Sequence, residues 1–139
     1  MMEHFPHGEF FVALRESDLV LDVNGASDDV GADIILYTQK DGDNANQRWT
    51  WDNENKSLRN VQSGHVLSFH AVAALTPARQ DRLFEDAKTQ RFEYYDYTIS
   101  THADEDLVLG APSKELGAVV ALVPRDNDDW NQMWEIRKY

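Results

Sequence analysis

A Gln-x-aromatic triplet occurs three times in this chain, as Gln47-Arg48-Trp49, Gln90-Arg91-Phe92 and Gln132-Met133-Trp134. The three glutamines lie 43 and 42 residues apart. A fixed spacing in this range indicates copies of one supersecondary unit, each too small to bury its own apolar face. The triplets therefore predict an internal three-fold repeat.

A second, mostly apolar motif precedes each triplet in the same order, as Leu19-Val20-Leu21-Asp22, His65-Val66-Leu67-Ser68 and Leu107-Val108-Leu109-Gly110. Two motifs that recur in register give repeats of about residues 9–52, 53–95 and 96–139. The repeats fill the chain, whose 139 residues are enough for one domain with its own core. We therefore expect a single domain over residues 1–139.

Each repeat has the pattern of about four short strands. In the first repeat, apolar or alternating runs cover 10–14, 19–23, 34–37 and 47–51, and polar or Asn-Gly turn sequences separate them. The third repeat follows the same plan at 97–100, 107–109, 119–123 and 134–136. The second is less regular, because 71–75 is also compatible with a helix and 81–84 is polar for a strand.

The repeats predict an all-β fold, since no 3.6-residue periodicity persists outside that segment. Three four-stranded units that share one core around a pseudo-three-fold axis describe a β-trefoil. A propeller needs at least four blades and a solenoid needs capping repeats, so both fit the pattern less well.

The charge balance excludes several classes of partner. Thirteen basic residues against 25 acidic ones give a formal net charge of −12. Such a surface repels phosphate backbones and anionic lipid head groups, so we expect neither nucleic-acid nor membrane binding. Apolar stretches such as 118–123 are far shorter than the roughly 20 residues of a spanning helix, so no membrane insertion is expected.

The cysteine count bears on location. The chain contains no cysteine, so a disulfide framework and a thiolate metal site are excluded. Residues 1–6 lack the basic flank and apolar core of a signal peptide. We expect a cytoplasmic protein; secretion stays open as the alternative, for which the sequon Asn55-Lys56-Ser57 is the weak indication.

Cofactors, metals and catalysis have no sequence support. The acidic run 41–44 lacks the glycine and glutamate that a calcium loop of this type requires, and 126–129 is interpreted as a solvated loop. The five histidines show no pairing at helical or strand spacing. No nucleophile or paired carboxylate is marked, so we expect no cofactor and no enzyme.

The first repeat resembles the ricin-B-type (R-type) lectin repeat. The resemblance rests on Val20-Leu21-Asp22-Val23, Asn24-Gly25, Ile35-Leu36-Tyr37 and Asn46-Gln47-Arg48-Trp49. That family carries Gln-x-Trp in each of three β-trefoil subdomains, and the resemblance extends over essentially the whole chain, though it is loose in the second repeat. Secreted members usually have a cysteine pair in each repeat, so this chain is similar to the cysteine-free members.

The resemblance also implies a sugar site. In that family a carboxylate after the Val-Leu motif accepts hydrogen bonds from sugar hydroxyls, an aromatic ring stacks on the pyranose, and the Asn before Gln-x-Trp adds an amide contact. Asp22, Tyr37 and Asn46 match these positions, and Gln47 is expected behind them, orienting the carboxylate.

The other two repeats lack parts of this set. Ser68 and Thr89 replace the acid and the amide in the second repeat, where Phe84 is the remaining candidate for the aromatic ring. In the third repeat, Gly110 replaces the acid and Val123 replaces the ring, so Asn131 is the part of the set that remains. Trp130 is a candidate substitute for the ring. We therefore predict one well-formed site, in the first repeat.

Structural interpretations of the same residues stand beside the functional ones. The three glutamines and their aromatic partners are interpreted mainly as scaffold, because a trefoil core needs a repeated large ring. Asp22 is also compatible with a turn residue that accepts from the amides of Asn24 or Gly25. Tyr37 fits a sugar platform and an ordinary surface residue equally well.

The resulting prediction is a carbohydrate-binding lectin for galactose or N-acetylgalactosamine on glycoproteins or glycolipids. One shallow site of this kind has a dissociation constant of roughly 0.1 to 1 mM, so avidity would need a homodimer or a multivalent ligand. The alternative is a trefoil scaffold that binds proteins through its loops, such as a protease inhibitor, with vestigial sugar sites.

Overall fold

The computed structural model describes residues 4–139, which form twelve β-strands and four short 3-10 helices. The first repeat contributes β1 (Phe10–Leu14), β2 (Leu19–Val23), β3 (Ile34–Thr38) and β4 (Trp49–Asp52). The second contributes β5 (Ser57–Asn60), β6 (Val66–Phe69), β7 (Ala78–Asp81) and β8 (Phe92–Tyr95). The third contributes β9 (Thr98–Thr101), β10 (Leu107–Gly110), β11 (Ala121–Pro124) and β12 (Trp134–Lys138). The 3-10 helices are η1 (Asn24–Ala26), η2 (Ala45–Gln47), η3 (Lys88–Gln90) and η4 (Trp130–Gln132).

Six of the strands form a barrel and the other six form hairpins against it. Around the barrel, β1 pairs with β12 and β4, β4 with β5, and β8 with β9. Backbone hydrogen bonds from Phe92 N to Lys56 O (2.8 Å) and from Trp134 N to Tyr97 O (2.7 Å) close the remaining gaps. The hairpins are β2–β3, β6–β7 and β10–β11. This arrangement is the predicted β-trefoil.

The hairpins also meet one another. Isolated bridges join Asp33 to Arg79, Ile35 to Val119 and Pro77 to Ala121. Each hairpin therefore contacts both others through its second strand or the segment just before it. This three-way contact fixes the position of every hairpin relative to the barrel.

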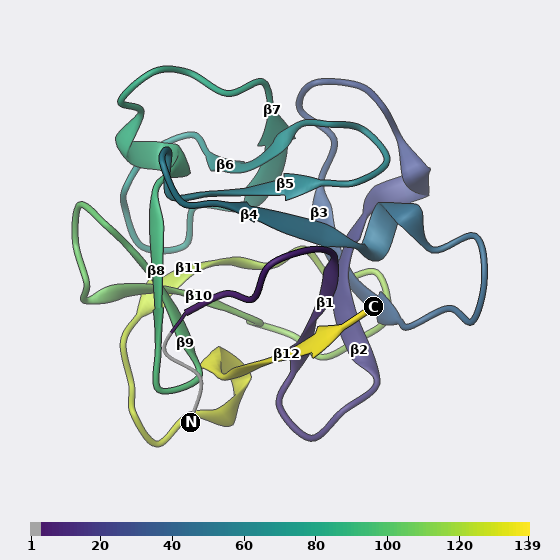
Figure 1. The fold of residues 1–139 in the computed structure, drawn as a ribbon. Coiled ribbons are helices and arrows are strands. Elements are labelled where there is room, and N and C mark those ends of the chain that lie inside the picture. The colour runs from purple at the N-terminus through teal and green to yellow at the C-terminus, as the bar shows by residue number, and fades with distance from the viewer. Residues whose placement is uncertain (1–3) are drawn as a thin grey trace.

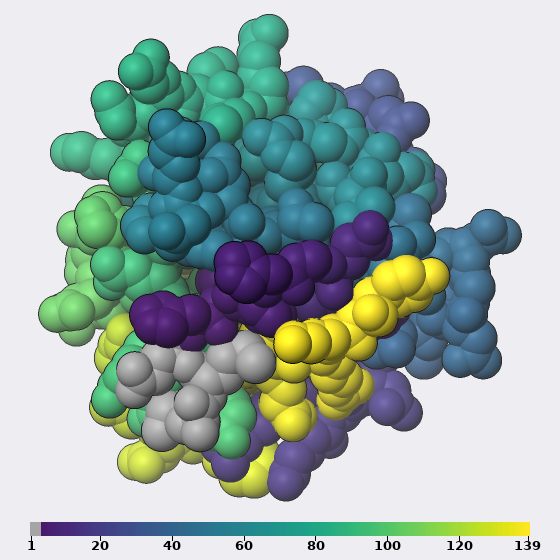
Figure 2. Space-filling model, viewed as in Figure 1, coloured from purple at the N-terminus to yellow at the C-terminus, as the bar shows by residue number. Residues whose placement is uncertain are grey.

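The first and last strands lie together. β12, in yellow, runs beside β1, in purple, near the middle of the molecule (Figure 1). On the face seen in Figure 2, the purple N-terminal segment crosses between teal residues of β4 and β5 and the yellow C-terminal strand. The antiparallel β1–β12 pair joins the first repeat to the third and completes the barrel.

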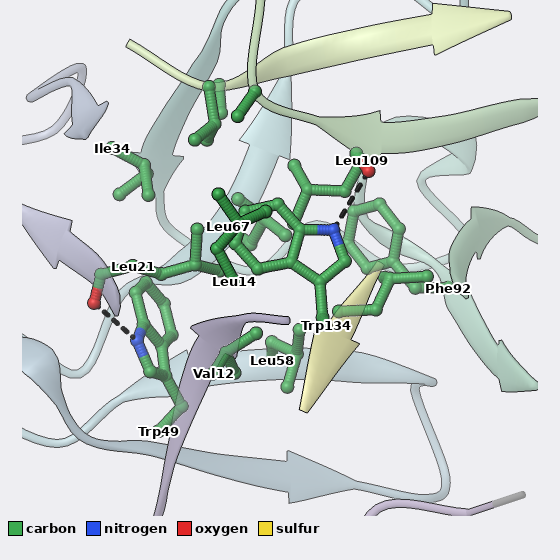
Figure 3. Packing of buried hydrophobic residues seen from close by; sticks show 14 of the residues in the cluster. Val12, Leu14, Leu21, Ile34, Trp49, Leu58, Leu67, Phe92, Leu109 and Trp134 are labelled. Atoms are coloured by element: carbon green, nitrogen blue, oxygen red, sulfur yellow. Dashed lines mark hydrogen bonds between the residues drawn. The ribbon is translucent and has the colours of Figure 1, made fainter. Parts of the chain in front are cut away.

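One core cluster contains side chains from all three repeats, including the aromatic residues of the three triplets (Figure 3). Trp49, Phe92 and Trp134 are 0%, 1% and 0% exposed. The indole N–H of Trp49 donates to Leu21 O (3.3 Å), and that of Trp134 donates to Leu109 O (2.9 Å). The Phe92 ring carries no N–H group, so the second repeat fills the same position with an apolar ring that needs no hydrogen-bond acceptor.

The expected strands are nearly all present, with two local differences. Residues 71–75 form bends and turns and not a helix, and the third strand of the second repeat is Ala78–Asp81, not 81–84. The last hairpin strand begins at Ala121, two residues later than expected, because Val119 forms an isolated bridge with the first repeat. Within residues 4–139, no helix is long and apolar enough to cross a membrane.

Candidate functional site

The three glutamines perform the same structural task. Each side-chain amide donates to a backbone carbonyl at the end of the third strand of its repeat, or one residue beyond it, and accepts from the N–H two residues further along. The pairs are Thr38 O and Lys40 N for Gln47, Arg82 O and Phe84 N for Gln90, and Pro124 O and Asp126 N for Gln132, at 2.8 to 3.0 Å. The glutamines therefore hold the loop that follows each hairpin, in agreement with their interpretation as scaffold.

Asp22 lies at the end of β2 with its side chain turned toward η2. It is 4% exposed. Its Oδ2 accepts from Gln47 Nε2 (2.9 Å) and its Oδ1 accepts from Asn46 Nδ2 (3.2 Å). The turn interpretation does not hold, since within residues 4–139 the Asp22 carboxylate accepts from neither Asn24 N nor Gly25 N, and Asn24 N donates to Asp33 O (3.0 Å).

Asn46 links the carboxylate to a lysine. Besides Asp22, its Nδ2 donates to Val23 O (3.1 Å), and its Oδ1 accepts from Lys40 Nζ (2.9 Å). Lys40 was not anticipated as a site residue. No motif marks it, because its position follows from the hydrogen bond between its own N–H and Gln47, which forms only in the folded loop.

The electrostatics of Asp22 reflect two opposing effects. Burial raises the pKa of its carboxyl group, because removal from water disfavours the charged form. The Gln47 hydrogen bond, the Lys40 charge and the Asn46 hydrogen bond lower it, but they do not offset the burial. The ionised carboxylate is thus held at a cost in folding free energy, and such a group is a candidate for function.

These side chains line one hollow in the surface. The hollow has a volume of about 200 Å³, and its lining includes Asp22, Tyr37, Lys40 and Asn46. Tyr37, one of these lining residues, is 42% exposed. Gln47 is fully buried behind the carboxylate, as expected from the sequence. The structure thus brings all four predicted residues together.

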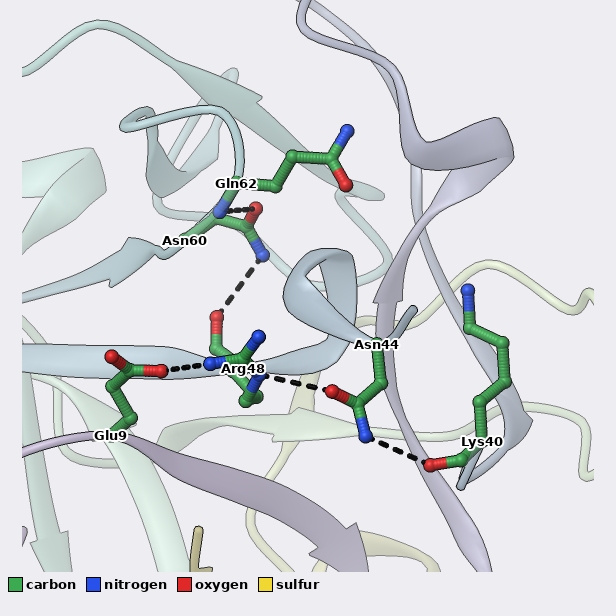
Figure 4. A network of polar contacts seen from close by, with 6 residues as sticks. All are labelled: Glu9, Lys40, Asn44, Arg48, Asn60 and Gln62. Carbon is green, nitrogen blue, oxygen red and sulfur yellow. Dashed lines mark hydrogen bonds and ion pairs between the residues drawn. The ribbon is translucent and has the colours of Figure 1, made fainter. Parts of the chain in front are cut away.

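A polar network holds the loop that carries Lys40 and Asn46 (Figure 4). Arg48 Nε donates to Asn44 Oδ1 (3.0 Å), and Asn44 Nδ2 donates to Lys40 O (2.9 Å). Arg48 also forms an ion pair with Glu9. Since these contacts fix the loop at both ends, the site is largely formed before any ligand arrives.

The second repeat lacks this site for a reason that the strand register makes clear. Val20 pairs with Tyr37 across the first hairpin, and Val66 pairs with Asp81 across the second. Asp81, and not Phe84, therefore takes the place of Tyr37. Phe84, the candidate ring of the second repeat, instead lies in the loop held by the glutamine, at the position of Lys40.

In the third repeat, a side chain fills the position that corresponds to the Asp22 hollow. A Cβ atom built on Gly110 would lie 2.4 Å from Cγ2 of Val123. The Val123 side chain therefore fills the space that a carboxylate at position 110 would need. Trp130 does not restore the site, because its ring packs on the guanidinium of Arg15 from the first repeat, 4.2 Å from its centroid.

Metal ions have no candidate site in the part of the chain that the structure describes. Within residues 4–139, no group of three or more His, Cys, Asp or Glu side chains is placed to hold one. The arrangement around Asp22 instead offers one charged acceptor, one ammonium donor, one amide and one flat ring. This is the chemistry needed to hold a polyhydroxylated ring with an apolar face.

A three-fold barrel with one complete polar hollow beside its first hairpin defines the class of β-trefoil lectin domains. The family model described as "Ricin-type beta-trefoil lectin domain-like" matches residues 3–81, which is more than half of the chain. The chain belongs to this family. Lectin domains of the family are typically non-catalytic, although they also occur in enzymes and toxins.

Solved structures support the same fold. The mdaA-1 domain is 26% identical with a TM-score of 0.88, over 99% of this chain and 94% of that one. The C-half of the earthworm R-type lectin, in complex with GalNAc, is 23% identical with a TM-score of 0.81, over 96% of this chain and 100% of that one. The designed three-fold symmetric protein ThreeFoil is 22% identical with a TM-score of 0.84, over 94% of this chain and 99% of that one. A sequence search of curated proteins finds no significant match.

Proposed function

We propose that the protein is a lectin that binds a galactose-type sugar, galactose or N-acetylgalactosamine, through the hollow in its first repeat. The observation that carries this proposal is the Asp22 carboxylate, held by Asn46 and Gln47 in the same hollow as the exposed Tyr37. The GalNAc complex of the earthworm lectin, which shares the fold, supports the choice of sugar.

Each part of the hollow has a role in this proposal. The Asp22 carboxylate accepts hydrogen bonds from two neighbouring sugar hydroxyls, which are stronger than bonds to a neutral acceptor. The Lys40 ammonium supplies donors to sugar oxygens. Both N–H groups of the Asn46 amide already donate, to Asp22 Oδ1 and Val23 O, so Asn46 contributes through its Oδ1, which can accept from a sugar hydroxyl. The Tyr37 ring packs on the C–H face of the pyranose, and the buried Gln47 keeps the carboxylate oriented.

The single complete site sets the expected strength. One shallow site gives a dissociation constant of roughly 0.1 to 1 mM, so binding to cell-surface or secreted glycans would depend on many sugar copies or on a homodimer. A clustered ligand should therefore be retained far better than the free monosaccharide.

The test is glycan-array binding and GalNAc titration of wild type, Asp22→Ala and Ser68→Ala. Ser68 is the matched control, because it occupies the same place in the second repeat and is also buried. We expect Asp22→Ala to lose binding and Ser68→Ala to keep it, with both folded by circular dichroism. Equal losses in both variants would contradict the single-site proposal. Absence of any glycan signal, together with inhibition of a protease, would favour the alternative of a protein-binding scaffold.

A further inference from the structure

A second groove lies between the third repeat and the turn that follows β1. It has a volume of about 540 Å³, and its lining includes Arg15, Tyr97, Arg125 and Trp130. None of the residues that line the Asp22 hollow lines this groove. It is therefore a separate feature of the surface.

The guanidinium of Arg15 packs on two aromatic rings. Its Cζ is 4.3 Å from the ring centroid of Tyr97 and 4.2 Å from that of Trp130. Its hydrogen bond within residues 4–139 runs from Nη1 to the Met133 thioether (3.2 Å), which is a weak acceptor. No acidic group of the described residues forms an ion pair with it. The planar fork is thus fixed in place with donors left to satisfy.

A second arginine lines the same groove. Arg125 donates from Nη1 to Thr98 Oγ1 (3.1 Å) and from Nε to Glu105 O (2.9 Å). Since Thr98 follows Tyr97 in the chain, the two guanidinium groups touch neighbouring residues. Arg125 likewise has no ion-pair partner among residues 4–139. The groove therefore sets two arginines against one acidic lining residue, Asp96, on a chain of net charge −12.

The three-fold scaffold does not require this arrangement. The backbone bond from Arg15 N to Met133 O is repeated from Val61 N to Arg48 O and from His102 N to Arg91 O, each 2.9 Å long. The positions equivalent to Arg15 are therefore Val61 and His102. The residues that begin the equivalent 3-10 helices, in place of Trp130, are Ala45 and Lys88. The stacked arginine occurs at one of the three junctions between repeats, so packing alone does not explain it.

We propose that this groove binds a carboxylate-bearing saccharide, such as a uronic acid unit of a glycan. The carboxylate lies on the Arg15 and Arg125 guanidinium groups, where a fork of N–H donors matches it. The sugar ring packs against Trp130, which is 45% exposed. Exposed Asp96 at the rim accepts from sugar hydroxyls. The saccharide class rests on the proposed lectin function, whereas the preference for an anionic group rests on the two arginines.

The test uses NMR titration with two probes that differ in one group, glucuronate and glucose. We expect glucuronate to shift the indole N–H signal of Trp130 and to bind at least about tenfold more tightly than glucose, because only glucuronate carries the carboxylate. Arg15→Gln and Arg125→Gln should each weaken glucuronate binding by about tenfold. Arg125→Gln leaves the aromatic stack in place, so it reports on recognition even if Arg15→Gln disturbs the fold.

Controls separate this groove from the first site. Arg59→Gln removes the same charge from an arginine outside the groove and should leave glucuronate binding unchanged. A GalNAc titration read at residues around Asp22 tests the proposed function independently. The proposal would be overturned by an unmoved Trp130 signal, by equal affinity for glucose, or by arginine variants that bind like wild type. Sodium sulfate giving the same shifts at the same affinity would reduce the groove to a simple anion site and also overturn it.

Discussion

Gln47 Nε2 donates to Asp22 Oδ2 at 2.9 Å and to Thr38 O at 3.0 Å, so one amide group both orients the site carboxylate and holds the loop beside it. In the third repeat the equivalent amide of Gln132 donates to Pro124 O, and Gly110 offers it no side chain. The same scaffold residue thus has one additional partner in the first repeat. This difference allows stability and binding to be separated by experiment.

Gln47→Ala and Gln132→Ala should both destabilise the fold, since each removes bonds to two buried or half-buried backbone groups. We expect a loss of about 1–3 kcal/mol in the free energy of unfolding for each variant, measured by urea denaturation. Gln47→Ala should also abolish sugar binding, whereas Gln132→Ala should keep it. Loss of binding in both variants would mean that the glutamines act on the site only through overall stability.

Sugar binding should weaken in acid at a higher pH than for an ordinary aspartate, whose pKa is about 3.9. Burial raises the pKa of Asp22, so protonation of the acceptor begins earlier as the pH falls. Folding responds in the opposite direction. The Asp22 contribution to stability is fully present below the unfolded pKa and is lost as the pH rises through the folded pKa.

Both effects can be measured against Asp22→Asn, which does not titrate at this position. As the pH falls, the free energy of unfolding of wild type should rise relative to that of the variant. The affinity of wild type for GalNAc, measured by calorimetry over the same pH series, should fall. A wild-type affinity that stays constant through the acid range would argue against a role for the ionised carboxylate.

Tyr37→Ala should reduce binding at least about tenfold with a change in unfolding free energy of no more than about 0.5 kcal/mol, because the ring is exposed. Tyr37→Phe should keep most of the affinity, since stacking uses the ring face. Phe84→Ala is the control, because it removes a similarly exposed ring from the second repeat. If Phe84→Ala weakened binding as much as Tyr37→Ala, the register argument would be wrong.

Gly110→Ala should destabilise the protein by about 1–3 kcal/mol, since the new methyl group overlaps Val123 Cγ2. It is therefore a poor control for binding. The double variant Gly110→Ala/Val123→Ala removes the overlap and should recover part of the loss. Thermal unfolding of Gly110→Ala, Val123→Ala and the double variant measures this directly, and additive losses would show that the two side chains do not interfere.

Trp134→Phe should cost about 1–3 kcal/mol of unfolding free energy, because Leu109 O loses the indole donor inside the core. Trp49→Phe should cost less, since its bond to Leu21 O is longer, 3.3 Å against 2.9 Å. The second repeat already uses Phe92 in this position, so both variants should fold. Chemical denaturation gives both values, and a larger loss at Trp49 would contradict the ranking.

Several parts of the candidate site could be anticipated because the repeats calibrate one another. Counted from each glutamine, Asp22 and Asn46 stand out as residues that the fold does not need, since Ser68 and Thr89 occupy the same places in the second repeat. The same method does not place Phe84, which lies at the position of Lys40 and not at that of Tyr37. The loop after β7 has no periodic pattern, so only the pairing of Val66 with Asp81 shows which residue faces the site.

The sequence by itself determined the three-fold repeat, the all-β class and nearly all the strands, because apolar spacing and turn residues act over a few neighbouring positions. Tertiary structure alone decided that Lys40 joins the site, that Val123 closes the third repeat and that Trp130 packs on Arg15. These contacts join side chains from different strands, loops or repeats. They form only when the barrel closes and the loops adopt their folded conformations. No local sequence pattern predicts contacts between residues so far apart in the chain.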